Sequence, residues 1–220
     1  MYLCNADFRE QLRARLRHFD RRAASTNETV GAAVALPVVE CGHGADLEGL
    51  PNCDSWSKDA ALLLTRRSSR LRDHPRQWAL PGGRIDPGES ALGAALRELH
   101  EEVDLEVDES QVLGQLDDFV TRSGFTITPV VVWVGDARHV RPNPGEVDSI
   151  HRIPVAEFLR HDAPMLDYDE GEHQPVLRMP VGTTWIAAPT AALLYQFREL
   201  CLLERATRVA HFEQPQFAWK

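Results

Sequence analysis

The chain has 220 residues, a formal net charge of −9 and 43% hydrophobic residues, which is enough for one domain with a sizeable core and extensions. The acidic charge argues against an extended nucleic-acid-binding surface, and no apolar run is long enough to span a membrane. The amino terminus lacks the apolar core of a signal peptide, and its acidic residues argue against a mitochondrial transit peptide.

The four cysteines are scattered along the chain, at positions 4, 41, 53 and 201. Cys41, His43 and Cys53 lie close enough in sequence to suggest a structural zinc site, but a fourth ligand at regular spacing is missing. Reduced thiols are the simpler interpretation, and we therefore expect a cytoplasmic protein.

The first predicted element is an amphipathic helix over residues 6–22, inside an amino-terminal extension of residues 1–28. Its apolar side is formed by Phe8, Leu12, Leu16 and Phe19. We expect this side to pack on the chain's own domain; a homodimer contact or a flap over a substrate site are the alternatives.

Two strands are predicted next, over residues 29–40 and 60–66. The second contains the apolar run Leu62–Leu64, which indicates a buried strand. Residues 41–59 between them are polar and contain glycines, so we expect a loop there, as a substrate-specific insertion or a disordered segment.

A basic cluster follows the second strand and stands out in an acidic chain. It comprises Arg66, Arg67, Arg70, Arg72 and Arg76, with His74 among them. The planar guanidinium group suits phosphate oxygens, so the cluster predicts binding of a substrate with several phosphates. The alternative is that single arginines are solvated or pair with nearby acids.

Gly82, Gly83 and the turn-forming residues 84–88 lead into a predicted helix whose amino end Glu89 or Ser90 can cap. An apolar stripe on this helix is formed by Leu92, Ala95, Leu96, Leu99 and Val103. Its opposite face is predicted to present Glu98, Glu101 and Glu102 as an acidic ledge.

Carboxylates three and four positions apart on a helix are neighbours and repel each other unless a cation neutralises them. A hard divalent cation that prefers oxygen ligands, Mg²⁺ or Mn²⁺, is the expected partner. A solvated acidic helix face is the alternative.

The rest of the chain mixes strands, helices and loops. Strands are expected over 112–116, 119–127, 130–134 and 147–154, with a loop at 142–145. A short helix is expected over 155–160, a loop-rich stretch with hairpin character over 161–182, and a helix over 190–204 that begins after Pro189. The carboxy-terminal segment 206–220, with Phe212, Phe217 and Trp219, predicts a last strand or an arm.

Residues 83–105 resemble the Nudix box, G-x5-E-x7-R-E-U-x-E-E-x-G-U, in which U is aliphatic. The matching residues are Gly83, Glu89, Arg97, Glu98, Leu99, Glu101, Glu102 and Leu105. Asp104 replaces the family's second glycine; because Asp tolerates a left-handed or turn conformation, we expect the change to affect only the helix end. The resemblance implies an α/β fold, a Nudix-type α/β/α sandwich with a mixed central sheet, over about residues 29–205.

Residues 62–83 resemble a second motif, that of the coenzyme A diphosphatase subgroup, L-L-T-x-R-[SA]-x3-R-x3-G-x3-F-P-G-G. The matching residues are Leu63, Leu64, Thr65, Arg67, Ser68, Arg72, Pro81, Gly82 and Gly83. Leu80 replaces the motif's phenylalanine. Arg76 replaces its glycine and adds bulk and charge that either obstruct the usual substrate pose or contact a phosphate.

Two later stretches are similar to the same subgroup. Residues 143–147 resemble its N-P-x-E-V loop, and residues 185–191 resemble its W-G-A-T-A motif with residues added. In many Nudix enzymes a glutamate on a loop after the central strands is an additional metal ligand or base, which singles out Glu146. A plain exposed loop acid is the alternative.

The resemblance implies a role for each motif residue. Glu98 and Glu102, one turn apart, are expected to be the main ligands of Mg²⁺ or Mn²⁺, and Gly83 would offer its backbone carbonyl. Glu101 is expected to be a further ligand or the catalytic base, with Glu146 competing for the role of base.

Glu89 and Arg97 are expected to be architectural, pairing to fix the loop against the helix. The subgroup resemblance implies hydrolysis of the diphosphate in coenzyme A or acyl-coenzyme A, a small-molecule substrate. Another nucleoside diphosphate derivative (ADP-ribose, NADH or a nucleoside triphosphate) is the first alternative. A non-catalytic nucleotide-binding or regulatory protein of the same fold is the second.

Overall fold

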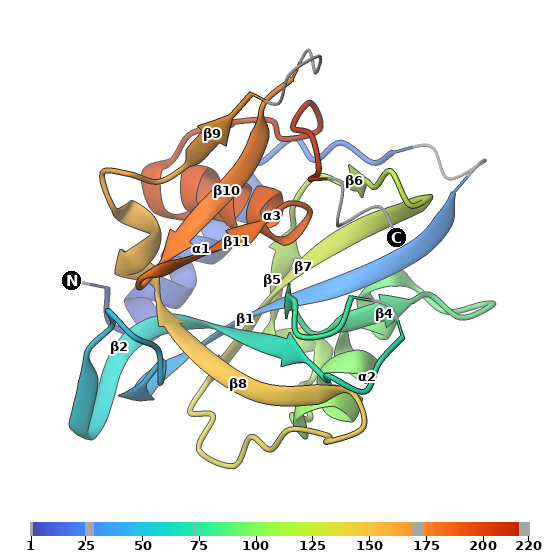
Figure 1. Ribbon diagram of the computed structural model, residues 1–220. Coiled ribbons are helices and arrows are strands. Elements are labelled where there is room, and N and C mark those ends of the chain that lie inside the picture. Colours follow the sequence, from blue (N-terminus) through green and yellow to red (C-terminus); the bar gives the residue numbers. More distant parts are fainter. Residues whose placement is uncertain (1, 25–28, 73, 169–173, 216–220) are drawn as a thin grey trace.

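The computed structural model describes residues 2–24, 29–72, 74–168 and 174–215. Figure 1 shows a large curled sheet, a second smaller sheet, and helices packed on both sides of the large sheet. The helical elements are α1 (Ala6–Arg17), α2 (Ala91–Val103), η1 (Glu109–Gln111), η2 (Val155–Leu159), α3 (Thr190–Phe197) and η3 (Arg198–Leu202). The large sheet contains β1 (Val30–Gly44), β2 (Asn52–Arg67), β3 (Trp78–Ala79), β4 (Gly82–Arg84), β5 (Val112–Gln115), β6 (Phe119–Val120), β7 (Phe125–Gly135) and β8 (Val147–Pro154). The small sheet contains β9 (Met165–Asp167), β10 (Val176–Val181) and β11 (Thr184–Ala187).

The centre of the large sheet is the parallel pair β1 and β7, in register from Val30↔Phe125 to Val38↔Trp133. Both strands are rich in Val and are buried along most of their length, as expected for parallel strands covered on both faces. The other pairs in this sheet are antiparallel: β2, β4, β5, β6, β3 and β8 complete it. The sheet is therefore mixed, as predicted.

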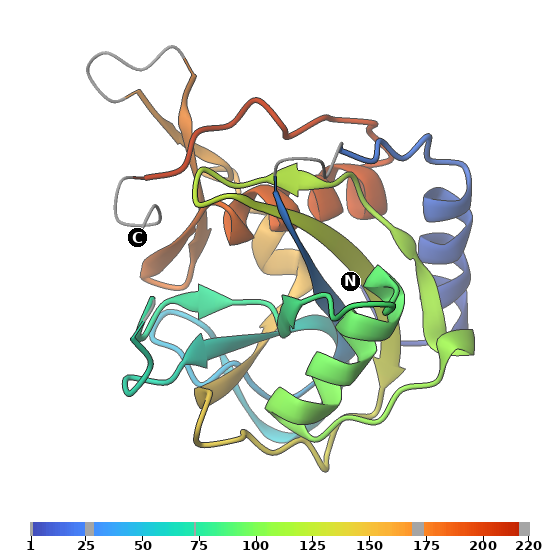
Figure 2. The same cartoon turned by 90° about the vertical axis from the view of Figure 1, so that its right-hand side faces the viewer.

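Helices cover both faces of this sheet. On one face, Leu99 and Val103 of α2 belong to the same buried cluster as Leu63 of β2. On the other face, Leu62 and Leu64 belong to the larger core that also includes residues of α1 and α3. Successive residues of β2 thus alternate between the two cores, because neighbouring side chains of a strand point to opposite faces. Figure 2 shows α2 on one side of the sheet and α3 on the other, which confirms the α/β/α sandwich.

The predicted loop at 41–59 is wrong over most of its length. β1 continues to Gly44 and β2 already begins at Asn52, so the two strands form a long hairpin. The glycines that suggested a loop mark irregularities of pairing instead: Gly42 and Gly44 have φ values of 64° and 106°, and the register shifts at both. The outer part of β2 is mostly exposed, so its sequence lacks the alternation that identifies a half-buried strand.

The predicted strand over 119–127 is broken, and the strand predicted over 130–134 begins earlier. β6 ends at Val120, the chain turns at Gly124 with φ of 86°, and β7 then runs without interruption through Pro129. Pro129 is tolerated because the partner of β7 changes there from β6, at Phe119↔Ile127, to β5, at Gln115↔Val130.

The predicted strand over 147–154 is β8, and the helix predicted over 155–160 is a 3₁₀ segment. The helix predicted over 190–204 is α3 followed by the π-helical turn η3. The helix predicted over 6–22 ends earlier, at Arg17. Its residues Phe8, Leu12 and Leu16 are buried in the larger core, so the apolar side that a dimer or a flap would need is already occupied within the chain.

The described part of the carboxy-terminal segment, up to residue 215, runs along the domain as an arm: Glu213 makes an isolated bridge to Val176, and Phe212 belongs to the larger core. Phe217 and Trp219, which the prediction included, lie outside the described residues. Among the helices that the structure describes, none has the length and apolar character needed to cross a membrane.

Candidate active site

The helix that carries the acidic residues has clear ends. Ser90 is its N-cap, and its hydroxyl accepts a hydrogen bond from the Gly93 amide at 3.0 Å. Asp104 ends the helix in the left-handed conformation, with φ of 58°, and its amide donates to the His100 carbonyl at 2.9 Å. Asp104 thus adopts the conformation for which a glycine is usual, and the departure is confined to the helix end, as expected.

Glu89 and Arg97 form a two-point ion pair. Arg97 Nε and Nη2 lie 3.0 and 3.1 Å from the two carboxylate oxygens of Glu89, and Nη2 also donates to the Arg84 carbonyl at 3.1 Å. The hydrogen bonds from Arg97 lower the pKa of the Glu89 carboxyl. This pair ties the glycine-rich loop to α2, in the arrangement predicted from the sequence.

Three carboxylates come together beside this loop, from Glu98, Glu102 and Glu146. One oxygen from each lies within 4.8 Å of the others; we call this group the acidic cluster. Glu102 is only 5% exposed, and burial, followed by the charge of Glu98, raises the pKa of its carboxyl to about 8. Burial likewise raises the pKa of Glu98, whereas its hydrogen bond from Arg97 acts in the opposite direction.

Glu101 lies outside the acidic cluster. Its side chain is half exposed and accepts a hydrogen bond from Arg97 Nη1 at 3.1 Å. The predicted ledge of three acids on the face opposite the apolar stripe is therefore divided. Glu98 and Glu102, four residues apart, share a face that borders the buried stripe, and Glu101 is rotated away from it.

Glu146 reaches the cluster because its loop is attached to the end of α2. The Asn143 amide donates to the Glu102 carbonyl at 2.9 Å, and the Val147 amide donates back to Asn143 at 2.8 Å. The Glu146 carbonyl accepts from the Ser68 amide at 2.8 Å, which fixes the same loop to the end of β2. The N-P-x-E-V stretch is thus the connection that carries a third carboxylate to a helix distant in sequence.

The acidic cluster fits a hard divalent cation. Glu102 Oε2 is buried and has no hydrogen-bond partner among the described residues, which is costly unless a positive charge satisfies it. A Cβ at Gly83 would overlap the Glu98 carboxylate, so only glycine lets the strand approach the cluster so closely. Three carboxylate oxygens with a nearby backbone form the donor set that Mg²⁺ and Mn²⁺ prefer.

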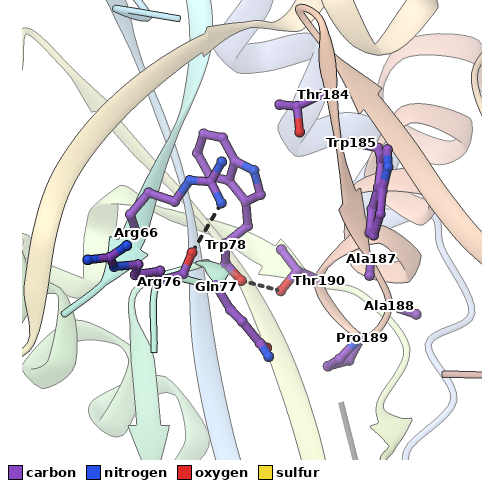
Figure 3. Close-up of a pocket in the computed structure, with 10 residues that line it drawn as sticks. All are labelled: Arg66, Arg76, Gln77, Trp78, Thr184, Trp185, Ala187, Ala188, Pro189 and Thr190. Atoms are coloured by element: carbon purple, nitrogen blue, oxygen red, sulfur yellow. Dashed lines mark hydrogen bonds between the residues drawn. The ribbon is translucent and has the colours of Figure 1, made fainter. Parts of the chain in front are cut away.

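A cavity of about 630 Å³ adjoins the cluster, and Gly83 and Arg67 line it together with apolar residues such as Phe125, Ile127 and Leu193. A second cavity of about 320 Å³ lies next to it, because Gln77, Trp78, Pro189 and Thr190 line both. Figure 3 shows the smaller cavity, with Trp78 on one side and Trp185 on the other. The two cavities share a wall, and the larger one lies beside the acidic cluster; together we call them the cleft.

The predicted arginines do not act as one group. Arg66 and Arg67 lie at the end of β2, and Arg66 stacks over the Trp78 ring at 3.8 Å while Arg67 lines the larger cavity. Arg76 lines the smaller cavity. Arg70 and Arg72 are exposed and line neither cavity.

Arg76 has φ of 60°, so the position needs a left-handed backbone. This backbone region favours glycine, which is the residue that the related motif has at this position. Leu80, which replaces the motif's phenylalanine, is buried in the larger core.

Sequence analysis missed the cleft-lining role of Trp78, Gln77 and Phe125. Trp78 lies between the arginine cluster and the Pro81-Gly82-Gly83 turn, and an aromatic residue at such a place is a sequence signal for a cleft wall. Trp185 and Thr190 were noticed only as part of a motif. Within the described ranges, Cys41, His43 and Cys53 form no group that could hold a metal, and all four cysteines are free.

The fold and the loop–helix site define a Nudix domain. The model of the NUDIX domain family matches residues 55–177, more than half of the chain. The chain therefore belongs to the Nudix family, a class of hydrolases that act on pyrophosphate bonds and generally use divalent metals.

Its relatives carry the family name. The chain is 46% identical over 103 residues to a protein of Yersinia enterocolitica named "Uncharacterized Nudix hydrolase NudL", covering 46% of this chain and 53% of that protein. It is 36% identical over 104 residues to "Nudix hydrolase 3" of Caenorhabditis elegans, covering 46% and 43% of the two chains. The chain thus spans about half the length of the curated relatives it matches. Among solved structures, the MutT protein of Methanosarcina mazei Go1 is similar at 21% identity and a TM-score of 0.42, over 64% of this chain and 83% of that one.

Proposed function

We propose that this chain is a divalent-metal-dependent hydrolase that cleaves the diphosphate of coenzyme A or acyl-coenzyme A. The products are 3′,5′-ADP and (acyl-)4′-phosphopantetheine. The observation that carries the proposal is the position of the acidic cluster at the start of a two-part cleft. Gly83 joins the two, because it lines the larger cavity and its Cα directly faces the Glu98 carboxylate.

The shape and charge of the cleft support a large, multiply phosphorylated substrate. The two adjacent cavities, of about 630 and 320 Å³, provide room for substrate groups on more than one side of a diphosphate. Arg67 lines the first cavity, and Arg66 and Arg76 line the second. Guanidinium groups bind phosphate oxygens well, so the basic residues are placed where the phosphates of such a substrate would lie. The subgroup motifs around residues 62–83, 143–147 and 185–191 favour coenzyme A within this class.

In this proposal Glu98 and Glu102 hold Mg²⁺ or Mn²⁺, and the Gly83 carbonyl is a further ligand. The ion supplies charge neutralisation on the diphosphate and a lowered pKa for a bound water. Arg97 keeps Glu98 in place through a hydrogen bond of 2.8 Å to Oε1. Arg67 lines the larger cavity, its charge acts on Glu102, and it binds diphosphate oxygens beside the cluster.

Glu146 is assigned as the general base. Its carboxylate belongs to the acidic cluster and is exposed, so it can take a proton from water and release it to solvent. Water attacks one phosphorus, the bridging P–O bond breaks, and the leaving phosphate takes the electron pair. Glu101 is already engaged with Arg97 and lies outside the cluster, which favours Glu146 over Glu101.

We further propose that residues 29–205 are the catalytic unit, with 1–28 and 206–220 as extensions that support it. The acidic cluster and the arginines that line the cleft lie in the first of these ranges, and Gln214 of the carboxy-terminal segment also lines the larger cavity. Arg208 and Arg21 bind the buried Asp117 and Asp118, at 2.7 and 2.6 Å, so both extensions are held to the domain by ion pairs.

The test is a hydrolysis assay with Mg²⁺ and separately with Mn²⁺. The substrates are coenzyme A, acetyl-coenzyme A, ADP-ribose, NADH and a nucleoside triphosphate, and the products are identified by mass spectrometry. We expect release of 3′,5′-ADP from coenzyme A well above turnover of the others. Preferential turnover of ADP-ribose or NADH would assign another diphosphate, and no turnover with either metal would support the non-catalytic alternative.

A further inference from the structure

Trp78 carries a buried hydrogen-bond donor that the fold does not use. The side chain is 8% exposed, and its Nε1 has no hydrogen-bond partner among the described residues. An indole N–H normally finds an acceptor when it is buried, because leaving it unpaired is unfavourable. In Figure 3 the indole nitrogen lies on the edge of the ring turned toward Thr184 and Trp185, across the smaller cavity. The nitrogen is shielded from solvent, so an acceptor atom of a ligand would have to reach this edge of the ring to satisfy the donor.

The Trp78 ring already has two neighbours within the chain. The Arg66 guanidinium covers the ring at 3.8 Å, and the ring of His151 meets it at 4.9 Å with an angle of 66° between the planes. A base that stacks needs an open ring face. The position of Trp78 therefore favours an acceptor atom at the indole N–H over a stacked base.

Arg66 adds a positive charge beside the same donor. Arg66 pairs with Trp78 in the ladder between β2 and β3, so the two side chains lie on the same face of the sheet. One of its nitrogens donates to the Arg76 carbonyl at 3.1 Å, which holds the guanidinium over the ring. Arg67, the next residue, points to the opposite face, where its charge acts on Glu102. The charges of Arg66 and Arg67 therefore act at two separate places, Arg66 at the smaller cavity and Arg67 near Glu102.

The remaining wall of the smaller cavity is compatible with an anion. Its described lining residues include Arg76 and the hydroxyl-bearing Thr184 and Thr190, and none of them is acidic. Because Trp78 and Thr190 line both cavities, a ligand can extend from the larger cavity into the smaller one.

We propose that the smaller cavity is a subsite for a phosphate monoester of the substrate, in which Trp78 Nε1 and the Arg66 guanidinium donate to the phosphate oxygens. The inference rests on the proposed function for the rest of the substrate: a nucleotide whose diphosphate lies at the acidic cluster and whose ribose carries a further phosphate. The subsite discriminates between nucleotides with and without that phosphate, and it acts in binding and not in bond cleavage.

The test measures binding without metal, so it does not depend on turnover. Isothermal titration calorimetry in EDTA compares 3′,5′-ADP with 5′-AMP on the wild type and on Trp78→Phe, Arg66→Gln and Arg70→Gln. We expect 3′,5′-ADP to bind the wild type roughly tenfold or more tightly than 5′-AMP, as a charge-assisted hydrogen bond predicts.

Trp78→Phe removes only the N–H and keeps an aromatic ring, so it should weaken the binding of 3′,5′-ADP several-fold and leave the binding of 5′-AMP unchanged. Arg66→Gln should remove the preference, and Arg70→Gln, with the same loss of charge on an exposed residue outside both cavities, should retain it.

Equal affinities for the two nucleotides, or an unchanged preference in both Trp78→Phe and Arg66→Gln, would overturn the subsite. Thermal denaturation of each variant establishes that it is folded. Hydrolysis of coenzyme A and of 3′-dephospho-coenzyme A separates this inference from the proposed function. Equal turnover of both compounds would support the proposed hydrolysis and contradict the subsite. Binding that depends on the 3′-phosphate, without turnover, would support the subsite and contradict the proposed hydrolysis.

Discussion

The carboxylate of Glu98 occupies the space that a side chain at Gly83 would need. A Cβ at position 83 would overlap Glu98 Oε1. Gly83 lies on strand β4, and Glu98 lies on helix α2. Position 83 therefore determines how closely β4 approaches α2, and with it the width of the acidic cluster.

Gly83→Ala should push Glu98 out of the cluster. We expect metal affinity to fall by about tenfold or more, as for changes that displace a ligand, with a parallel loss of turnover. Calorimetric titration with Mn²⁺ and an activity assay measure the two effects. Gly31→Ala is the matched control, because the nearest atom to its added methyl group is the flexible end of Ile85, at 3.3 Å. Equal metal affinity in both variants would contradict the close approach of Gly83 to Glu98.

Without metal, Glu102 should make the protein less stable as the pH rises. Burial raises the pKa of its carboxyl from 4.5 to about 8, so between these values the folded state holds a proton that the unfolded state has lost. The free energy of unfolding therefore falls as the pH rises through this window, by roughly 2–4 kcal/mol. Glu102→Gln cannot ionise, and its stability in EDTA should exceed that of the wild type at pH 8 by more than it does at pH 5.

The same variant tests the role of the metal. Mg²⁺ should raise the Tm of the wild type at pH 8 and leave the Tm of Glu102→Gln nearly unchanged, because the variant lacks the carboxylate that binds the ion. Turnover of Glu102→Gln should be greatly reduced while its circular dichroism spectrum is retained. Near-normal activity, or equal stabilisation of both proteins by Mg²⁺, would remove Glu102 from the metal site.

Glu146→Gln and Glu101→Gln separate the two candidates for the general base. Glu146 lies in the acidic cluster, whereas Glu101 accepts a hydrogen bond from Arg97 outside it. We expect Glu146→Gln to lower kcat by about 10²–10⁴-fold, the usual contribution of a general base, and Glu101→Gln to lower it much less. The reverse order would assign the base to Glu101. Both are single carboxylate-to-amide changes, so each controls for the other.

Arg76→Gly and Arg76→Ala test the left-handed backbone at this position. Both variants remove the guanidinium, but only glycine adopts φ near +60° without a steric penalty. Arg76→Gly should therefore be more stable than Arg76→Ala by about 1 kcal/mol in urea denaturation, once the greater flexibility of glycine in the unfolded state is included. Equal stabilities would show that residue 76 does not need the conformation of a glycine.

Local rules predict the helix at the site well. Ser90 caps α2, as its residue type predicts, and Asp104 ends the helix in the left-handed region while Glu89 pairs with Arg97, as the resemblance implies. The segments between strands were predicted less well. The hairpin of β1 and β2 contains polar, exposed positions and irregular register, and β7 continues through Pro129, so neither shows the alternation that sequence analysis depends on.

The sequence by itself determined what depends on neighbours within about one helical turn: the acidic helix, its caps and the approach of Glu98 to Glu102. The tertiary structure alone decided which third carboxylate joins them. Pairing of β2 with β8, at Arg67↔Val147, and the hydrogen bond from Asn143 to the Glu102 carbonyl bring Glu146 to the cluster, while Glu101 is turned away. The burial that perturbs Glu102 and the free N–H of Trp78 likewise arise only when separate strands and helices pack, because desolvation depends on atoms that are distant along the chain.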